Sequence, residues 1–333
     1  GYTLGGVGTS GDNPDHIYRS SAVDGSGRYE ILGRFSPSRR PVQFVVSVSP
    51  WLNETEIKSI PANAAGLGGK TSVLDDRHIK VASDGTFRLT LGGEAPADGS
   101  QHFALQPGPY SIGFRDVLAD WEKQEAAQLT IRRLDNHQAA PFDHKAFKRR
   151  VISRLDSYVG FWSDFPENWF GGLKPNTISP TLPREGGWGY LAGLRFDLKP
   201  DEAILVTTTR GGAQYQGIQV TDPWMIAASG RQHLTSYNPA QAKVDADGSY
   251  SFVIAPRDPG TANWLDTAGL RSGFAVLRWQ NLPAGASGEK LVREFKVIKL
   301  ADAKEIPGIA TITPQERVAQ VKMREASYSN RTR

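Results

Sequence analysis

The sequence contains no cysteine among its 333 residues. Disulfide bridges, thiolate catalysis and metal sites with cysteine ligands are therefore excluded. A lack of cysteine fits any cellular compartment, so the sequence leaves the localisation unknown. The chain begins at Gly1 rather than at Met and has no signal-like start, which is compatible with removal of a leader or of a longer N-terminus.

Long apolar runs and strongly basic stretches are also missing. No apolar run approaches the ~20 residues that span a bilayer, so we expect no membrane span. The net charge of +4 is spread along the chain, and no stripe of Lys or Arg alternates with aromatic residues. This pattern argues against a nucleic-acid partner. With 39% hydrophobic and 22% charged residues, the composition is that of a globular rather than a disordered chain.

The usual motifs for metals, phosphates and nucleophilic catalysis are absent too. The sequence has no His-x-His pair, no His-Glu-x-x-His helix and no dense set of carboxylates, so we expect no metal. The glycine runs Gly5–Gly8 and Gly66–Gly69 do not join a strand to a helix, and they are not phosphate-binding loops. Asp245 and Asp247 resemble part of a calcium loop, but no glutamate follows at the required spacing. No cofactor is therefore predicted.

Glycine and proline are frequent, and their scatter favours a β-rich fold with many tight turns. The β-branched run Val42–Val48 predicts a buried strand. Two strands flank the turn Asp24–Gly27, and its Asp-Gly chemistry predicts a hairpin.

An internal repeat is visible, and it predicts two related β units with the same strand order. Lys80–Leu91 matches Lys243–Ile254, including the Asp-Gly turn in each. Further matches follow in the same order along both halves: Pro50-Trp51 with Pro223-Trp224, His102–Gly108 with Asn263–Gly269, Ser111–Arg115 with Phe274–Arg278, and Leu129–Leu134 with Phe295–Leu300. We expect Trp51 and Trp224 to be equivalent and substantially buried.

Two helices are predicted beside the strands. In residues 142–159 the apolar residues Phe147, Val151, Leu155 and Tyr158 recur at helical spacing, with a basic solvated face elsewhere. Thr313 followed by Pro314 and Glu316 is typical of a capped helix start.

The predicted fold is therefore mainly β, with two related β-sandwich or jelly-roll-like units joined by a helix and followed by a C-terminal helix. We expect a first β-sandwich unit at residues 1–140, a helical and irregular linker at 141–187, a second β-sandwich unit at 188–305 and a C-terminal helical tail at 306–333.

Several short motifs together resemble a known bacterial family. They are Asp12-Asn-Pro-Asp15 with Tyr18, Asp247-Gly-Ser249, Arg257-Asp-Pro-Gly260, Asn263-Trp-Leu-Asp-Thr-Ala-Gly269 and Arg278-Trp279. The chain resembles the uncharacterised family known as domain of unknown function twelve-fourteen over residues 11–300, most strongly over 245–280. The resemblance implies β-sandwich or jelly-roll-like units and no particular reaction. Many members carry His where this chain has Leu270, so a reaction that needs that His would be lost here.

The stretch from Asn263 to Trp279 is the least generic part of the chain, and we predict a ligand site there. Asp266 and Thr267 would bind polar groups, the indoles would stack on a ring, and Arg271 and Arg278 would clamp an anion. The predicted ligand-binding residues are Trp224, Asn263, Trp264, Asp266, Thr267, Arg271, Arg278 and Trp279. The alternative is structural: Asp266 caps a turn, both indoles fill the core, and one arginine pairs with Asp258 or Asp266.

Four residues are weak candidates for proton transfer: Asp15, His16, Tyr18 and His233. Because they form no readable dyad or triad, the sequence favours a binding or assembly protein with an aromatic- and Arg/Asp-lined cleft in its second half. Its partners would be a small organic ligand and further copies of itself in a homo-oligomer. The alternative function is a cofactor-independent hydrolase, lyase or isomerase for a small ring-containing, lipid or sugar substrate.

Overall fold

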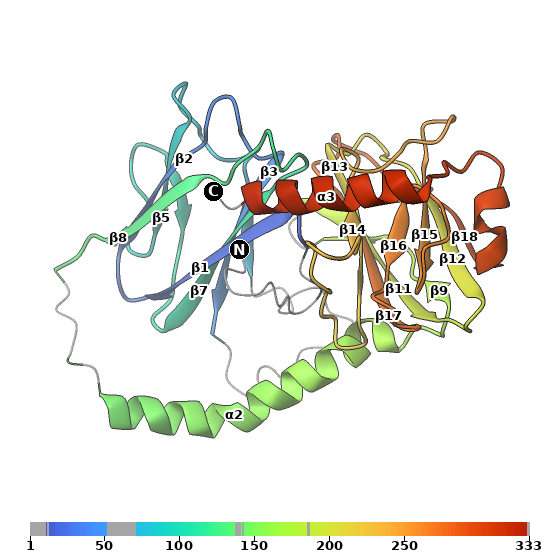
Figure 1. Cartoon of the computed structure of the whole chain (residues 1–333). Helices are drawn as coiled ribbons and strands as arrows, with labels where there is room; N and C mark the ends of the chain where they lie inside the picture. Colours follow the sequence, from blue (N-terminus) through green and yellow to red (C-terminus); the bar gives the residue numbers. More distant parts are fainter. Residues whose placement is uncertain are drawn as a thin grey trace.

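The computed structural model describes Gly11 and residues 13–51, 71–136, 141, 143–184 and 187–331. Asp12 and the two glycine runs named above lie outside these residues, as does the side chain of Tyr158. The described chain is mainly β, with strands arranged in four sheets that form two sandwiches (Figure 1). The predicted fold class is confirmed.

The first sandwich encloses a core of aliphatic and phenylalanine side chains that includes Ile31, Phe44, Leu89 and Ile112. One sheet has the order β1 (His16–Asp24), β7 (Pro109–Val117), β3 (Gln43–Pro50) and β4 (Ser72–Asp75). The facing sheet has the order β6 (Gln101–Phe103), β5 (Thr86–Leu91), β2 (Tyr29–Arg34) and β8 (Gln128–Arg133).

The second sandwich encloses a larger core around Trp279, Phe196 and Ile204. One sheet has the order β10 (Leu182–Pro183), β11 (Gly189–Asp197), β17 (Ser272–Gln280), β13 (Tyr215–Thr221) and β14 (Ser236–Tyr237), with β9 (Thr177–Ile178) also paired to β11. The facing sheet has the order β16 (Trp264–Asp266), β15 (Tyr250–Ala255), β12 (Glu202–Thr208) and β18 (Val292–Lys299).

The two sandwiches share one strand order, as the repeat predicted. The order β1-β7-β3-β4 corresponds to β11-β17-β13-β14, and β6-β5-β2-β8 corresponds to β16-β15-β12-β18. In each sandwich one short strand pairs in parallel with its neighbour, β6 with β5 and β16 with β15. The matched arginines Arg115 and Arg278 lie in the equivalent strands β7 and β17.

Two local predictions are wrong. The Asp24–Gly27 turn does not close a hairpin, because β1 pairs with β7 while β2 pairs with β5 and β8. The chain crosses there from one sheet to the other, so each strand can offer an apolar face to the shared core. Trp51 and Trp224 are 49% and 62% exposed rather than buried, because β3 and β13 end before them and both rings lie beyond the sheet.

Two long helices accompany the sandwiches. The helix α2 (His144–Pro166) is longer than predicted, begins at the side-chain cap of Asp143 and continues into the π-helical turn η1 (Glu167–Gly171). A 3-10 helix, η2 (Leu300–Glu305), precedes α3 (Pro314–Asn330), which has the predicted capping box between Thr313 and Glu316. Figure 1 shows α3 lying across both sandwiches and α2 running apart from the sheets. No described helix has the length and apolar character needed to cross a membrane.

Candidate ligand-binding site

The structure brings together two residues that the sequence separates, His233 and Asp266. The Nδ1 atom of His233 lies 2.7 Å from Oδ2 of Asp266. The other carboxylate oxygen of Asp266 accepts a hydrogen bond of 2.8 Å from the backbone N–H of Ala268, so Asp266 also caps the turn that ends β16. At this turn Ala268 adopts a positive φ of 54°, a strained conformation for a residue with a Cβ. Asp266 therefore both supports the local backbone and orients a partly exposed imidazole.

A pocket of about 130 Å³ lies at this corner of the second sandwich. Its polar lining includes Asp222, Thr235, Asp266 and Thr267, and the remainder is mostly apolar: Val220, Thr221, Ile226, Ala227, Ala228 and Leu270. The Thr235 hydroxyl is buried and has no hydrogen-bond partner among the described residues. Buried hydroxyls are normally satisfied, and this one, like that of Thr261, is not, so a small polar group that reached it would supply the missing hydrogen bond.

The charges around the pocket select the kind of ligand. The Asp222 carboxylate accepts hydrogen bonds from the backbone N–H groups of Trp224 and Ile226, and Asp266 supplies a second carboxylate. No arginine or lysine of the described chain lines the pocket. Two carboxylates without a lining cation favour a neutral or cationic ligand with hydrogen-bond donors and disfavour an anion. The predicted anion clamp is not formed here, because Arg271 is exposed and Arg278 lies elsewhere.

Asn263 and Trp279, two other predicted ligand residues, lie away from the pocket. Asn263 uses its amide to bond the backbone of Lys243 and Ser251, which holds a loop against β15. Trp279 is fully buried in the sandwich core and donates to the carbonyl of Thr209. These two side chains therefore stabilise the fold. For Trp279 this agrees with the structural alternative, in which the indole fills the core.

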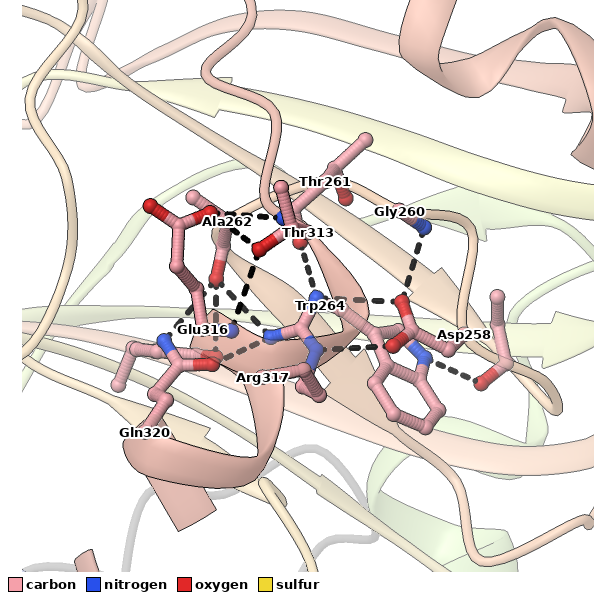
Figure 2. A network of polar contacts seen from close by, with 11 residues as sticks. Asp258, Gly260, Thr261, Ala262, Trp264, Thr313, Glu316, Arg317 and Gln320 are labelled. Atoms are coloured by element: carbon pink, nitrogen blue, oxygen red, sulfur yellow. Dashed lines mark hydrogen bonds and ion pairs between the residues drawn. The ribbon is translucent and has the colours of Figure 1, made fainter. Parts of the chain in front are cut away.

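Trp264 holds the C-terminal helix in place (Figure 2). Its indole N–H donates to the carbonyl of Ala255 at 2.9 Å, and the guanidinium of Arg317 lies 5.3 Å from the ring centroid. Arg317 also bonds both carboxylate oxygens of Asp258, at 2.9 and 3.1 Å. The partner of Asp258 is therefore Arg317 of α3, rather than Arg271 or Arg278.

Arg278 lies at the junction of the two sandwiches. It is buried and donates to the Gln219 side chain at 2.8 Å and to the carbonyl of Gly11 at 2.6 Å. These contacts join the N-terminal segment to β17 and β13. Trp224 stays exposed, although its backbone N–H bonds the pocket residue Asp222.

The candidates Asp15, His16 and Tyr18 lie at the same junction and not at the pocket. The carboxylate of Asp15 accepts three hydrogen bonds, from the Trp121 indole at 2.9 Å, the Asn238 amide at 2.9 Å and the Tyr215 hydroxyl at 2.7 Å. Burial raises the pKa of Asp15 above its usual value, while these donors oppose the rise. Because its donors come from both sandwiches, the main role of this carboxylate is to join them.

His16 is buried between two tyrosine rings. Its ring centroid is 5.6 Å from those of Tyr18 and Tyr215, and its Nδ1 lies 3.0 Å from the Tyr18 hydroxyl. Burial, aided by the positive charges of Arg115 and Arg278, holds the pKa of His16 well below its usual value. The imidazole is therefore neutral at pH 7, and among the described residues it has no carboxylate partner like that of His233.

A further cavity has no signal in the sequence. This cavity, of about 270 Å³, lies under α3 where the two sandwiches meet, and its lining includes Trp121, Leu234, Tyr237 and Arg324. No sequence signal joins these residues, since they come from three distant segments. No group of three or more histidines or acidic residues in the described part of the chain is placed to hold a metal ion.

Comparisons with known proteins bear on the fold. No protein-family model and no curated protein matches the chain. An uncharacterised protein from Burkholderia cenocepacia is similar in its crystal structure, with a TM-score of 0.69, 25% sequence identity, and coverage of 88% of this chain and 79% of that one. The VPA0106 protein from Vibrio parahaemolyticus has the same general fold, with a TM-score of 0.51, 13% identity, and coverage of 90% and 92%. The resemblance to domain of unknown function twelve-fourteen stays a prediction.

Proposed function

We propose that the protein is a binding protein that takes a small neutral or cationic organic ligand into the pocket lined by Asp266 and Thr235. The observation that carries this proposal is the Thr235 hydroxyl, which is buried in the pocket lining without a partner among the described residues. A ligand donor or acceptor would satisfy it, and Asp266 would accept a further hydrogen bond. The apolar side of the pocket would hold the carbon skeleton.

The test is ligand-observed NMR with a panel of polyols and primary amines, followed by titration of any hit. Thr235→Val removes the hydroxyl and keeps the shape, so we expect at least about tenfold weaker binding, ~1.4 kcal/mol, with an unchanged melting temperature. The matched control is Met323→Trp, which puts a bulkier side chain in the lining of the cavity under α3 and leaves the pocket intact. Binding that survives Thr235→Val and is abolished by Met323→Trp would place the ligand under α3 and refute the proposal.

Asp266→Asn and Arg271→Gln separate the two sides of the corner. Asp266 lines the pocket and Arg271 does not, so only the first variant should weaken binding. If Asp266→Asn lowers the melting temperature while binding is unchanged, the carboxylate serves only the turn at Ala268.

The His233–Asp266 pair favours a second candidate function, proton transfer by a cofactor-independent enzyme. When Nδ1 of the histidine donates to the carboxylate, the other ring nitrogen is left as a base, which is the arrangement of orienting acid and general base in many hydrolases. The assay is hydrolysis of small esters and glycosides by the wild type and by His233→Gln. Activity that does not depend on His233 would exclude this function.

A further inference from the structure

The helix α2 carries an apolar face that no other described part of the chain buries. Val151, Ile152, Leu155 and Val159 are between 46% and 61% exposed. Three of them recur every four residues, and Ile152 adjoins them, so all four lie along one side of the helix. We call these four residues the α2 stripe.

The α2 stripe lies on a part of the helix that extends away from the sandwiches. Among the described residues, the main contacts of α2 are with η1, its own continuation. The C-terminal end is anchored, since Phe165 packs with Trp169 and Phe170 against the second sandwich. Figure 1 shows the preceding turns running below the first sandwich, apart from its sheets. A helix with 23 residues is about 35 Å long, so it presents an extended surface.

The charges of α2 indicate what covers the stripe. The helix carries five basic residues and two aspartates: Lys145, Lys148, Arg149, Arg150, Arg154, Asp156 and Asp164. All five cations are exposed. At 3.6 residues per turn, Lys148 falls on the same side as the stripe, and Lys145 falls at one margin with Asp156 beyond it. Arg154 falls outside the other margin, and Asp164 falls on the opposite side. An apolar side bordered by cations suits the surface of an anionic bilayer.

A second copy of the chain fits less well. Pairing two stripes would bring two helices of net charge +3 together, with both Lys148 side chains at the contact. Four half-exposed aliphatic side chains also supply only a fraction of the ~800 Å² per partner that a standard interface buries. We propose that α2 binds, lying flat, to membrane surfaces that contain anionic lipids.

The test is co-sedimentation of the full chain with phosphatidylcholine vesicles that contain or lack phosphatidylglycerol. We expect at least about tenfold stronger binding to the anionic vesicles, with the difference reduced by added salt. The double variant Val151→Asp with Leu155→Asp should abolish binding, and Lys148→Glu should weaken it. All three positions are exposed, so the melting temperature should not change.

The matched controls are Val318→Asp and Lys322→Glu, the same changes at exposed positions of α3. Both should bind vesicles as the wild type does. Equal binding by the wild type and by the Val151→Asp, Leu155→Asp variant would overturn the proposal. So would a dimer, seen by light scattering, that this variant dissociates, because the stripe would then be an interface between two copies.

Discussion

Tyr215 of the second sandwich donates a hydrogen bond of 2.7 Å to the carboxylate of Asp15 in the N-terminal segment. Both side chains are fully buried, so neither can be hydrated and both depend on partners within the protein. Trp121 and Asn238 donate to the other oxygen of the same carboxylate, so one acceptor gathers donors from three separate segments. We therefore expect the two sandwiches to unfold together rather than as independent domains.

Replacement of Asp15 should destabilise the whole molecule. Asp15→Asn puts an amide donor where three donors converge, and we expect a loss of about 2–3 kcal/mol in the free energy of unfolding. Urea denaturation measures the loss, with Glu289→Gln at an exposed position as the control, expected to change by less than ~0.5 kcal/mol. A similarly small effect of Asp15→Asn would show that the network contributes little.

The pH dependence of stability should carry the signature of His16. Its pKa is held well below 6.5 in the folded protein by burial and by nearby arginines. Below pH 6.5 the unfolded chain therefore binds a proton that the folded chain excludes, and stability falls as the pH falls. The variant His16→Gln should lack this component, so the wild type should lose up to about 1.4 kcal/mol more per pH unit below 6.5. The free energy of unfolding of both proteins should be measured from about pH 4.5 to about pH 7.5, a range that includes the ordinary histidine pKa. Parallel curves for the two proteins would contradict this prediction.

The helix α3 should depend on Arg317. This side chain donates hydrogen bonds to Asp258 and to the carbonyl of Ala262, and its guanidinium lies over the ring of Trp264 (Figure 2). Arg317→Met removes the charged donor, while Asp258 keeps the Gly260 N–H and the Ala262 carbonyl keeps the Gln320 amide. Because of these remaining donors and the partial exposure of Asp258, we expect a loss of only about 2 kcal/mol. Limited proteolysis should cleave α3 faster in this variant. Lys322→Met, on the exposed side of the same helix, should change neither result.

The same substitution at two tryptophans should reduce the stability by very different amounts. Trp279 is fully buried, so Trp279→Ala should cost about 3–5 kcal/mol. Trp224 is mostly exposed, and Trp224→Ala should cost less than ~0.5 kcal/mol. Denaturant unfolding of both variants checks the contrast, and a large loss at Trp224 would show that its ring is covered in solution.

Local patterns in the sequence were enough to predict the architecture. The capped start of α3 follows from Thr313 and Glu316, because a capping box involves residues only three positions apart. The shared strand order follows from the repeat, because two similar sequences have the same turns and the same apolar faces. In contrast, the prediction of a hairpin at Asp24–Gly27 is wrong, because the turn residues determine the turn but not the sheet to which the next strand belongs.

The candidate site depends on contacts that no local pattern encodes. Both His233 and Asp266 could be recognised as chemically capable residues, yet they are 33 positions apart and meet only because β16 is placed beside the loop that precedes β14. Thr235 carries no signal in the sequence, since a single threonine stands out only when folding buries its hydroxyl without a partner among the described residues. The sequence by itself determined the two sandwiches and their helices, because these arise from periodicity, turns and caps among near neighbours. Only the tertiary structure decided that Trp264 supports α3, that Asp15 joins the sandwiches and that a pocket forms at Asp266, because each depends on which distant segments are brought into contact.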